Sequence, residues 1–149
     1  MKAVRHFGIV VRDMEKSLAF YRDLLGLKIE KSALESGNYL DKILGYNMGI
    51  IVRTVKMSAE SGPTLVELLQ FHNPESPPGR SPVPFKIGPT HIAFTVANLN
   101  EIYDRLLADG VPFTCKPLVA PGGKAKVTFC KDPDGTLIEL VEELDKAKL

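Results

Sequence analysis

The chain carries the same alternation of apolar and polar residues around two glutamates. Residues 64–69 read TLVELL and residues 136–141 read TLIELV, with Glu67 and Glu139 at matching places. Because side chains in a strand alternate with period two, each glutamate shares a strand face with apolar neighbours. Burying an isolated carboxylate among such neighbours costs several kcal/mol. The pattern therefore predicts two strands, each carrying an acid that needs a partner.

These two stretches belong to an internal repeat. HFGIVVRDMEKSLAFYRDLLGLKI, from His6, aligns with HIAFTVANLNEIYDRLLADGVPF, from His91, at an offset of 85 (91 minus 6). The offset is 84 between Gly26 and Gly110 (110 minus 26), so the second helix is expected to be one residue shorter. The two glutamates are only 72 apart (139 minus 67), so the first copy must contain extra loop.

Each copy is predicted to begin with a strand and continue with a helix. Asp13 and Asn98 are candidate N-caps, and Asn98 with Glu101 has the form of a capping box. Gly26 and Gly110 are natural helix stops. In the second copy, residues at helical spacing predict one apolar helix face, made of Leu99, Ile102, Tyr103, Leu106 and Leu107.

Three strand-like stretches follow each helix. In the second copy they are VPFTCKP, KAKVTFCK and GTLIELVE, separated by the turn sequences APGG and DPDG. The first copy has GIIVRTVKM and TLVELLQF, preceded by the insert ESGNYLDKILGYN, which we expect to form a short helix and to act as a pocket wall or lid. The predicted fold class is α+β, with two βαβββ modules in tandem and helices on one face of a curved mixed sheet.

A proline-rich segment separates the two copies. Residues 73–89 read NPESPPGRSPVPFKIGP and contain six prolines, which prevent regular structure. We therefore expect a first module over 1–72, a linker over 73–88 and a second module over 89–149, together forming one compact domain.

The first strand of each copy places a histidine on the face opposite its bulky residues. His6 lies beside Gly8, and His91 lies beside Ala93, so that each histidine has room next to it. The bulky face should receive the helix, which leaves both histidines on the opposite, concave face. The residues assigned to the bulky face are Phe7, Ile9, Val11, Ile92, Phe94 and Val96.

Two histidines and two glutamates at equivalent repeat positions predict a concave groove that binds one divalent metal ion. Two carboxylates would neutralise the ion, and two imidazoles with two carboxylates suit Zn, Ni, Co, Mn or Fe. The alternative is that the glutamates are half-exposed sheet residues paired with lysines such as Lys56 or Lys126. The predicted metal ligands are His6, Glu67, His91 and Glu139.

Composition excludes several classes of partner. The 149 residues include 19 basic and 18 acidic side chains, a net charge of +1, which provides no footprint for nucleic acid or an anionic membrane. A small-molecule substrate is expected instead.

No apolar run approaches the roughly 20 residues of a membrane span, and the start lacks a signal-peptide pattern, so we expect a cytoplasmic protein. Cys115 and Cys130 are expected to be reduced.

The sequence resembles the vicinal oxygen chelate superfamily, which includes glyoxalase I, methylmalonyl-CoA epimerase, extradiol dioxygenases and the fosfomycin and bleomycin resistance proteins. The resemblance rests on the opening histidine strand, FYRDLLGL at 20–27, HIAFTV at 91–96 and DPDGTLIELVEE at 132–143. It implies a metal site built from the first and last strands of each module, which are the positions of the four predicted ligands. It also implies a homodimer, because many members are dimers.

The resemblance implies a lyase or isomerase of the glyoxalase type. Such an enzyme chelates two neighbouring substrate oxygens and moves a proton next to a carbonyl through an enediolate, with Glu67 and Glu139 as candidate bases. Members that use glutathione carry arginine and asparagine where this chain has Val10 and Phe71. Two alternatives remain: a protein of the same fold that sequesters a drug or metabolite, and an iron-dependent dioxygenase.

Overall fold

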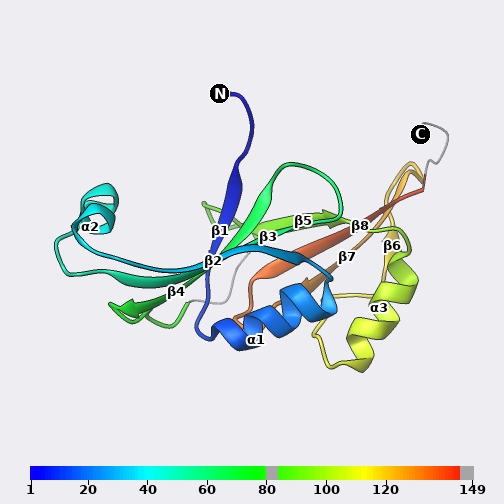
Figure 1. Cartoon of the computed structure of the whole chain (residues 1–149). Coiled ribbons are helices and arrows are strands. Elements are labelled where there is room, and N and C mark those ends of the chain that lie inside the picture. The colour runs from blue at the N-terminus through cyan, green and yellow to red at the C-terminus, as the bar shows by residue number, and fades with distance from the viewer. Residues whose placement is uncertain (80–83, 145–149) are drawn as a thin grey trace. The chain divides into compact units, whose positions relative to one another are not determined.

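The computed structural model describes residues 1–79 and 84–144 and divides the chain into two compact units, Met1–Gly79 and Arg80–Leu149. The division lies inside the predicted linker 73–88, of which residues 80–83 lie outside the described residues. Each unit contains one module with its own four-stranded mixed sheet (Figure 1). The α+β fold with two tandem modules is therefore as predicted.

The first module contains four strands, of which β1 (His6–Val10) pairs in parallel with β4 (Leu65–Asn73). The sheet continues with β3 (Ile51–Ser58) and β2 (Lys28–Ser36) as antiparallel neighbours, giving the order β1-β4-β3-β2. The helical elements are α1 (Met14–Leu18), η1 (Ala19–Leu24) and α2 (Asn38–Leu44). The insert thus forms the short helix that its sequence predicts.

The second module repeats this order, and its last three strands are shorter than their counterparts. It contains β5 (His91–Thr95), α3 (Leu99–Ala108), β6 (Leu118–Val119), β7 (Ala125–Lys131) and β8 (Leu137–Glu143), in the sheet order β5-β8-β7-β6. The strand predicted over VPFTCKP is wrong, since there Phe113 makes only an isolated bridge to Cys130 and the two-residue β6 follows. Pro112 and Pro117 lack the N–H groups that a continuous ladder needs.

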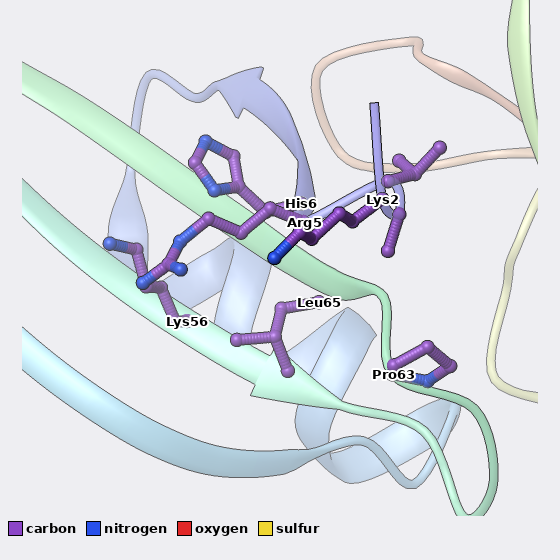
Figure 2. A pocket seen from close by; sticks show the side chains of 8 residues that line it. Lys2, Arg5, His6, Lys56, Pro63 and Leu65 are labelled. Atoms are coloured by element: carbon purple, nitrogen blue, oxygen red, sulfur yellow. The ribbon is translucent and has the colours of Figure 1, made fainter.

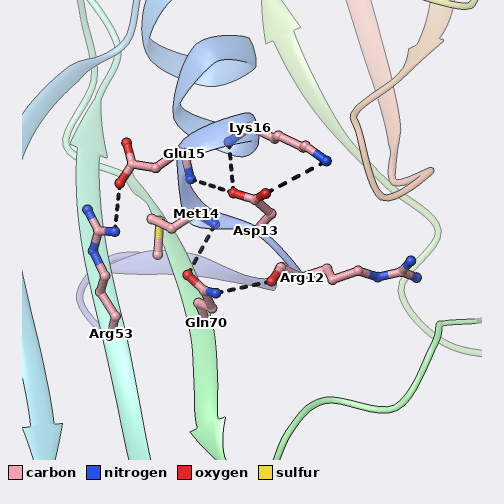
Figure 3. Close-up of polar contacts among 7 residues, drawn as sticks. All are labelled: Arg12, Asp13, Met14, Glu15, Lys16, Arg53 and Gln70. Carbon is pink, nitrogen blue, oxygen red and sulfur yellow. Dashed lines mark hydrogen bonds and ion pairs between the residues drawn. The ribbon is translucent and has the colours of Figure 1, made fainter.

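Each helix packs on the sheet face that carries the bulky residues. Ile9 and Leu68 are 5% and 0% exposed in the first module, and Ile138 and Leu140 are 0% and 1% exposed in the second. The face is also tied to the helix by a hydrogen bond, because Met14 N donates to Gln70 Oε1 at 3.1 Å (Figure 3). The prediction that the histidines lie on the opposite face is confirmed, since the histidine positions alternate with these buried ones.

The predicted helix boundaries are confirmed. Asp13 Oδ1 accepts hydrogen bonds from two amides of α1 (Figure 3), and Asn98 Oδ1 accepts one from Glu101 N. Gly26 and Gly110 have φ angles of 80° and 81°, a left-handed conformation that favours glycine. The predicted apolar face of α3 is wrong at one end, because Leu107 is 48% exposed.

The extra residue in the first helix is accommodated by π-helical turns. Leu25 N donates to Phe20 O, five residues back, at 2.9 Å, whereas α3 is α-helical over its whole length. A π-helical turn absorbs one additional residue without breaking the helix. This explains why the repeat offset changes from 85 to 84 across the helix while both helices still end at a glycine.

A buried aspartate holds the insert in place. Asp41 is 5% exposed, and its carboxylate accepts hydrogen bonds at 2.8 Å from the backbone N–H groups of Met48, Gly49 and Ile50. These donors, of which Ile50 is the strongest, lower the pKa of Asp41. The end of α2 is thereby fixed against the start of β3, where Leu40 and Ile50 share a small buried cluster.

Two further predictions concern cysteines and membrane helices. Cys115 and Cys130 are both free, as predicted, and burial raises the pKa of the Cys130 thiol to about 12. Across residues 1–79 and 84–144, no helix has the length and apolar character needed to span a bilayer.

Candidate metal-binding site

The first module brings His6 and Glu67 together. His6 Nε2 lies 3.0 Å from Glu67 Oε2, and the side chains are 36% and 10% exposed. The residues come from neighbouring parallel strands, in which Gly8 is the register partner of Glu67. A Cβ atom at Gly8 would approach Leu69 Cδ1 to 3.3 Å, so the glycine keeps this face open beside the pair.

Lys56 is a second partner of the Glu67 carboxylate. It stands directly opposite Glu67 on β3, and its Nζ lies 3.2 Å from Glu67 Oε1. Both carboxylate oxygens of Glu67 are therefore occupied, one by His6 and one by Lys56. The lysine pairing considered as an alternative for this glutamate is present, and it coexists with the histidine contact.

The second module brings His91 and Glu139 together in the same way. His91 Nε2 lies 3.1 Å from Glu139 Oε2, with side chains 38% and 22% exposed. The lysine alternative is wrong here, because Lys126 lies 3.4 Å from Glu142 instead. The residue opposite Glu139 on β7 is Phe129, whose ring packs edge-on against His91 at a centroid distance of 5.4 Å.

Thr90 contacts the other nitrogen of the His91 ring. Its Oγ1 lies 2.7 Å from His91 Nδ1, within hydrogen-bond distance. When Nδ1 donates a hydrogen bond to Thr90, the Nε2 lone pair is available to a metal ion, whereas a proton on Nε2 would be donated to Glu139. A metal-binding histidine is oriented in this manner by a partner at its second nitrogen.

The donor atoms of both pairs fit neighbouring positions on a divalent metal ion. Imidazole nitrogen and carboxylate oxygen bind such ions at about 2.0–2.2 Å, and two ligands at right angles are then about 3 Å apart. The two observed N–O distances, 3.0 and 3.1 Å, match this separation and also suit a hydrogen bond. Within either module, the described residues form no group of three or more His, Cys, Asp or Glu side chains that could hold a metal ion, and each module shows one His–Glu pair.

A pocket of about 490 Å³ adjoins His6 in the first module (Figure 2). It is formed by the N-terminal segment before β1, by the start of β4 and by Lys56 of β3. Its lining residues are Lys2, Ala3, Val4, Arg5, His6, Lys56, Pro63 and Leu65. The pocket therefore opens beside the predicted metal ligand and beside the lysine that contacts Glu67.

The two positions at which glutathione-using relatives are expected to be polar differ in their surroundings. Val10 is 51% exposed on the strand face that carries His6, and Phe71 packs against the buried cluster of the insert. Arg53, the register partner of Gln70, lies on the opposite sheet face from Phe71, and there its Nη1 donates to Glu15 Oε1 at 2.7 Å (Figure 3).

Sequence reasoning did not identify Thr90, Phe129 or Arg5 as parts of these surroundings. Thr90 and Arg5 directly precede the two histidines, so adjacency to a predicted ligand was a signal for both. Phe129 carries no such signal, because its position opposite Glu139 depends on the register between β7 and β8.

The fold, the tandem modules and the two His–Glu pairs lead to a family assignment. Residues 3–140 match the model of the Glyoxalase/Bleomycin resistance protein/Dioxygenase superfamily, and the chain belongs to this superfamily. This confirms the resemblance seen in the sequence.

Several relatives are similar over nearly their whole length. The uncharacterised protein YwkD of Bacillus subtilis is 33% identical over 149 residues, covering 96% of this chain and 98% of the relative. A lactoylglutathione lyase of Salmonella typhimurium is 28% identical over 145 residues, covering 96% and 94%. A crystal structure of a glyoxalase family protein from Bacillus cereus has a TM-score of 0.88 at 23% identity, covering 97% and 95%, and thus shares the fold.

Proposed function

We propose that the protein is a divalent-metal-dependent lyase or isomerase of the glyoxalase type. The observation that carries the proposal is the pair of His–Glu contacts, His6 with Glu67 and His91 with Glu139, at repeat-equivalent positions and at ligand-like distances. The similarity to lactoylglutathione lyases supports the same reaction class. The proposed metal is Zn, Ni, Co, Mn or Fe, held by all four residues.

When bound, the metal ion would act as a Lewis acid that polarises a substrate carbonyl and acidifies the adjacent C–H bond. The protein then has to supply a base that removes this proton and returns it. A carboxylate beside the ion is suited to this role, and the chain offers Glu67 and Glu139.

We propose Glu139 as the base. Glu67 has both oxygens engaged, by His6 and Lys56, and its side chain is 10% exposed, so moving it would break two contacts. The Glu139 side chain is 22% exposed, and its one described polar contact is with His91. Glu139 is thus the more mobile carboxylate, whereas Glu67 is the more firmly held ligand.

Metal titration tests the ligand set. We expect metal-stripped protein to bind about one equivalent of a divalent ion per chain. Glu67→Gln and Glu139→Gln should each weaken binding by more than the roughly 10–100-fold lost with an outer-shell partner. Glu143→Gln is the matched control, because Glu143 is an exposed residue of the same strand as Glu139. Equal binding by all variants, or none by the native protein, would refute the metal site.

Proton exchange tests the reaction. Metal-loaded protein should exchange the proton next to the carbonyl of a hemithioacetal or an acyl-thioester with deuterated solvent. Glu139→Gln should lower kcat more than Glu67→Gln does at saturating metal. Tight metal binding without exchange would favour the sequestering alternative, and oxygen uptake with a catechol would favour the dioxygenase alternative.

We further propose that the protein is a homodimer, and mixing the two glutamine variants tests how its sites are built. If one site takes its His–Glu pairs from two chains, a mixed dimer of Glu67→Gln and Glu139→Gln regains one unmodified site and binds metal. If each site belongs to one chain, mixing restores nothing. Sedimentation measures the dimer itself, and a monomer at micromolar concentration would contradict this proposal.

A further inference from the structure

Positive charge gathers around the pocket beside His6. Lys2, Arg5 and Lys56 line it together with His6, and its eight lining residues include no acidic side chain. Figure 2 shows the guanidinium of Arg5 and the ammonium of Lys56 ending on the same side of the pocket. A concave surface lined by charges of one sign concentrates small ions of the opposite sign.

The charge extends across the sheet beyond the pocket. Lys31 of β2 is the direct register partner of Lys56, and like charges at directly opposite positions destabilise a sheet. Among residues 1–79 and 84–144, the side chains of Arg5 and Lys31 have no hydrogen bond or ion pair, and the carboxylate that contacts Lys56 is Glu67. Glu35 and Glu30 on this face accept hydrogen bonds from Thr54 and Ser58, so Glu67 is the carboxylate in direct contact with a cation, and the pocket cations outnumber it.

Metal binding would increase this imbalance. Glu67 would share its charge between the ion and Lys56, leaving the Lys56 ammonium less compensated than in the metal-free protein. An oxyanion placed between Lys56 and Arg5 would restore the balance. Arginine is well suited to it, because its planar guanidinium donates two parallel hydrogen bonds to a carboxylate or phosphoryl group.

We infer that this pocket binds an oxyanion of the substrate, a carboxylate or phosphoryl group, through Arg5 and Lys56. The inference rests on the proposed function, because it places the anion on the same molecule whose neighbouring oxygens would reach the metal. It specifies the substrate class as anionic, with its charged group on the side of the first module. Arg5 and Lys56 thus act as specificity-determining residues.

Anion titration tests the inference on metal-stripped and on metal-loaded protein. Malonate serves as the carboxylate probe and inorganic phosphate as the phosphoryl probe, each followed by chemical shift changes in the labelled full-length chain at constant ionic strength. Loss of one charge-assisted contact should weaken binding roughly tenfold. We expect Arg5→Gln and Lys56→Gln each to weaken binding of the probe by this factor. The probe that binds more tightly to the native protein identifies the class of anion.

Lys42→Gln is the matched control, because it removes the same charge from α2, an element that does not line the pocket. Its anion affinity should stay within about twofold of the native value. Arg5→Gln keeps the test decisive if Lys56→Gln fails to fold, since the Arg5 side chain has no described partner to lose.

The outcomes separate the inference from the proposed function. Equal losses in Arg5→Gln and Lys42→Gln, or no binding of either probe, would overturn the anion pocket even if metal binds stoichiometrically. Arg5-dependent anion binding in a chain that binds no metal would retain the pocket and refute the metal-dependent reaction. Arg5-dependent binding that becomes tighter in metal-loaded protein is the result expected if both are correct.

Discussion

The two modules place the same His–Glu pair on equivalent strands but surround the glutamates differently. Opposite Glu67 stands Lys56, whose ammonium contacts the carboxylate at 3.2 Å, whereas opposite Glu139 stands Phe129, which packs against the histidine instead. The comparison teaches that equivalent residues of a repeat need not have equivalent roles. A carboxylate held from two sides is suited to staying in place, and one held from a single side is suited to moving.

Other parts of the repeat have stayed alike. Gln70 and Glu142 are 72 residues apart (142 minus 70), as are the two site glutamates, and each accepts a hydrogen bond from the first backbone N–H of its module's helix. They lie on the opposite sheet face from the glutamates, because each is three positions further along its strand. The last strand of each module thus carries a proposed metal ligand on one face and a helix anchor on the other.

The largest expected effect follows from removing the lysine that distinguishes the first module. Lys56→Met leaves the largely buried Glu67 carboxylate with His6 as its remaining described partner. Removing one partner of such a pair leaves a poorly compensated charge, so the free energy of unfolding of metal-free protein should fall by about 1–3 kcal/mol. Urea unfolding measures it. Lys42→Met, on exposed α2, should change stability by less than about 0.5 kcal/mol, and equal values for both would contradict the role of Lys56.

The insert provides a test that concerns the first module alone. The lowered pKa of Asp41 means that its ionised form is stabilised by folding, so its contribution is present at neutral pH and is lost as the pH falls below the ordinary aspartate value of about 4. Asp41→Asn should lower Tm at pH 7, and the difference from native protein should shrink toward pH 3. Thermal unfolding across this range checks it. A difference that is constant with pH would mean that the carboxylate charge has no part in holding the insert.

The comparison can also be tested by giving the second module the lysine that distinguishes the first. Phe129→Lys places an ammonium opposite Glu139, as Lys56 stands opposite Glu67. A metal ion must then compete with a charge-assisted contact, so metal affinity should fall about tenfold. Phe129→Leu is the control, because it removes the aromatic packing without adding charge. If both substitutions weaken metal binding equally, packing on His91 rather than charge at Glu139 is the important difference.

Much of this fold could be predicted because each copy of the repeat consists of local sequence patterns that specify strands and helix ends. Strand alternation placed His6 and Glu67 on one face, and cap residues and glycines marked the helix ends. The strand over VPFTCKP, directly after α3, was predicted wrongly, since Pro112 and Pro117 prevail over an apolar pattern. The residues opposite the two glutamates could not be predicted. Strand register determines which residue lies opposite Glu139, and register depends on turns and packing along the whole sheet.

The smallest effects are expected where the modules agree. Gln70→Ala removes the acceptor for Met14 N and the donor to Arg12 O (Figure 3), and Glu142→Ala removes the acceptor for Leu99 N and the partner of Lys126. Losing such side-chain hydrogen bonds costs about 0.5–1.5 kcal/mol, so the two variants should be destabilised to similar extents. Urea unfolding compares them, with exposed Glu143→Ala as the control.

Metal affinity separates these anchors from the ligands. Because Gln70 and Glu142 lie on the helix side of the sheet, their loss should leave metal binding by folded protein unchanged within about twofold, whereas Glu67→Gln and Glu139→Gln should abolish or greatly weaken it. A strong loss of metal affinity in Gln70→Ala alone would show that the first helix positions the ligands through β4. The helices would then be part of the site in the first module and only part of the scaffold in the second.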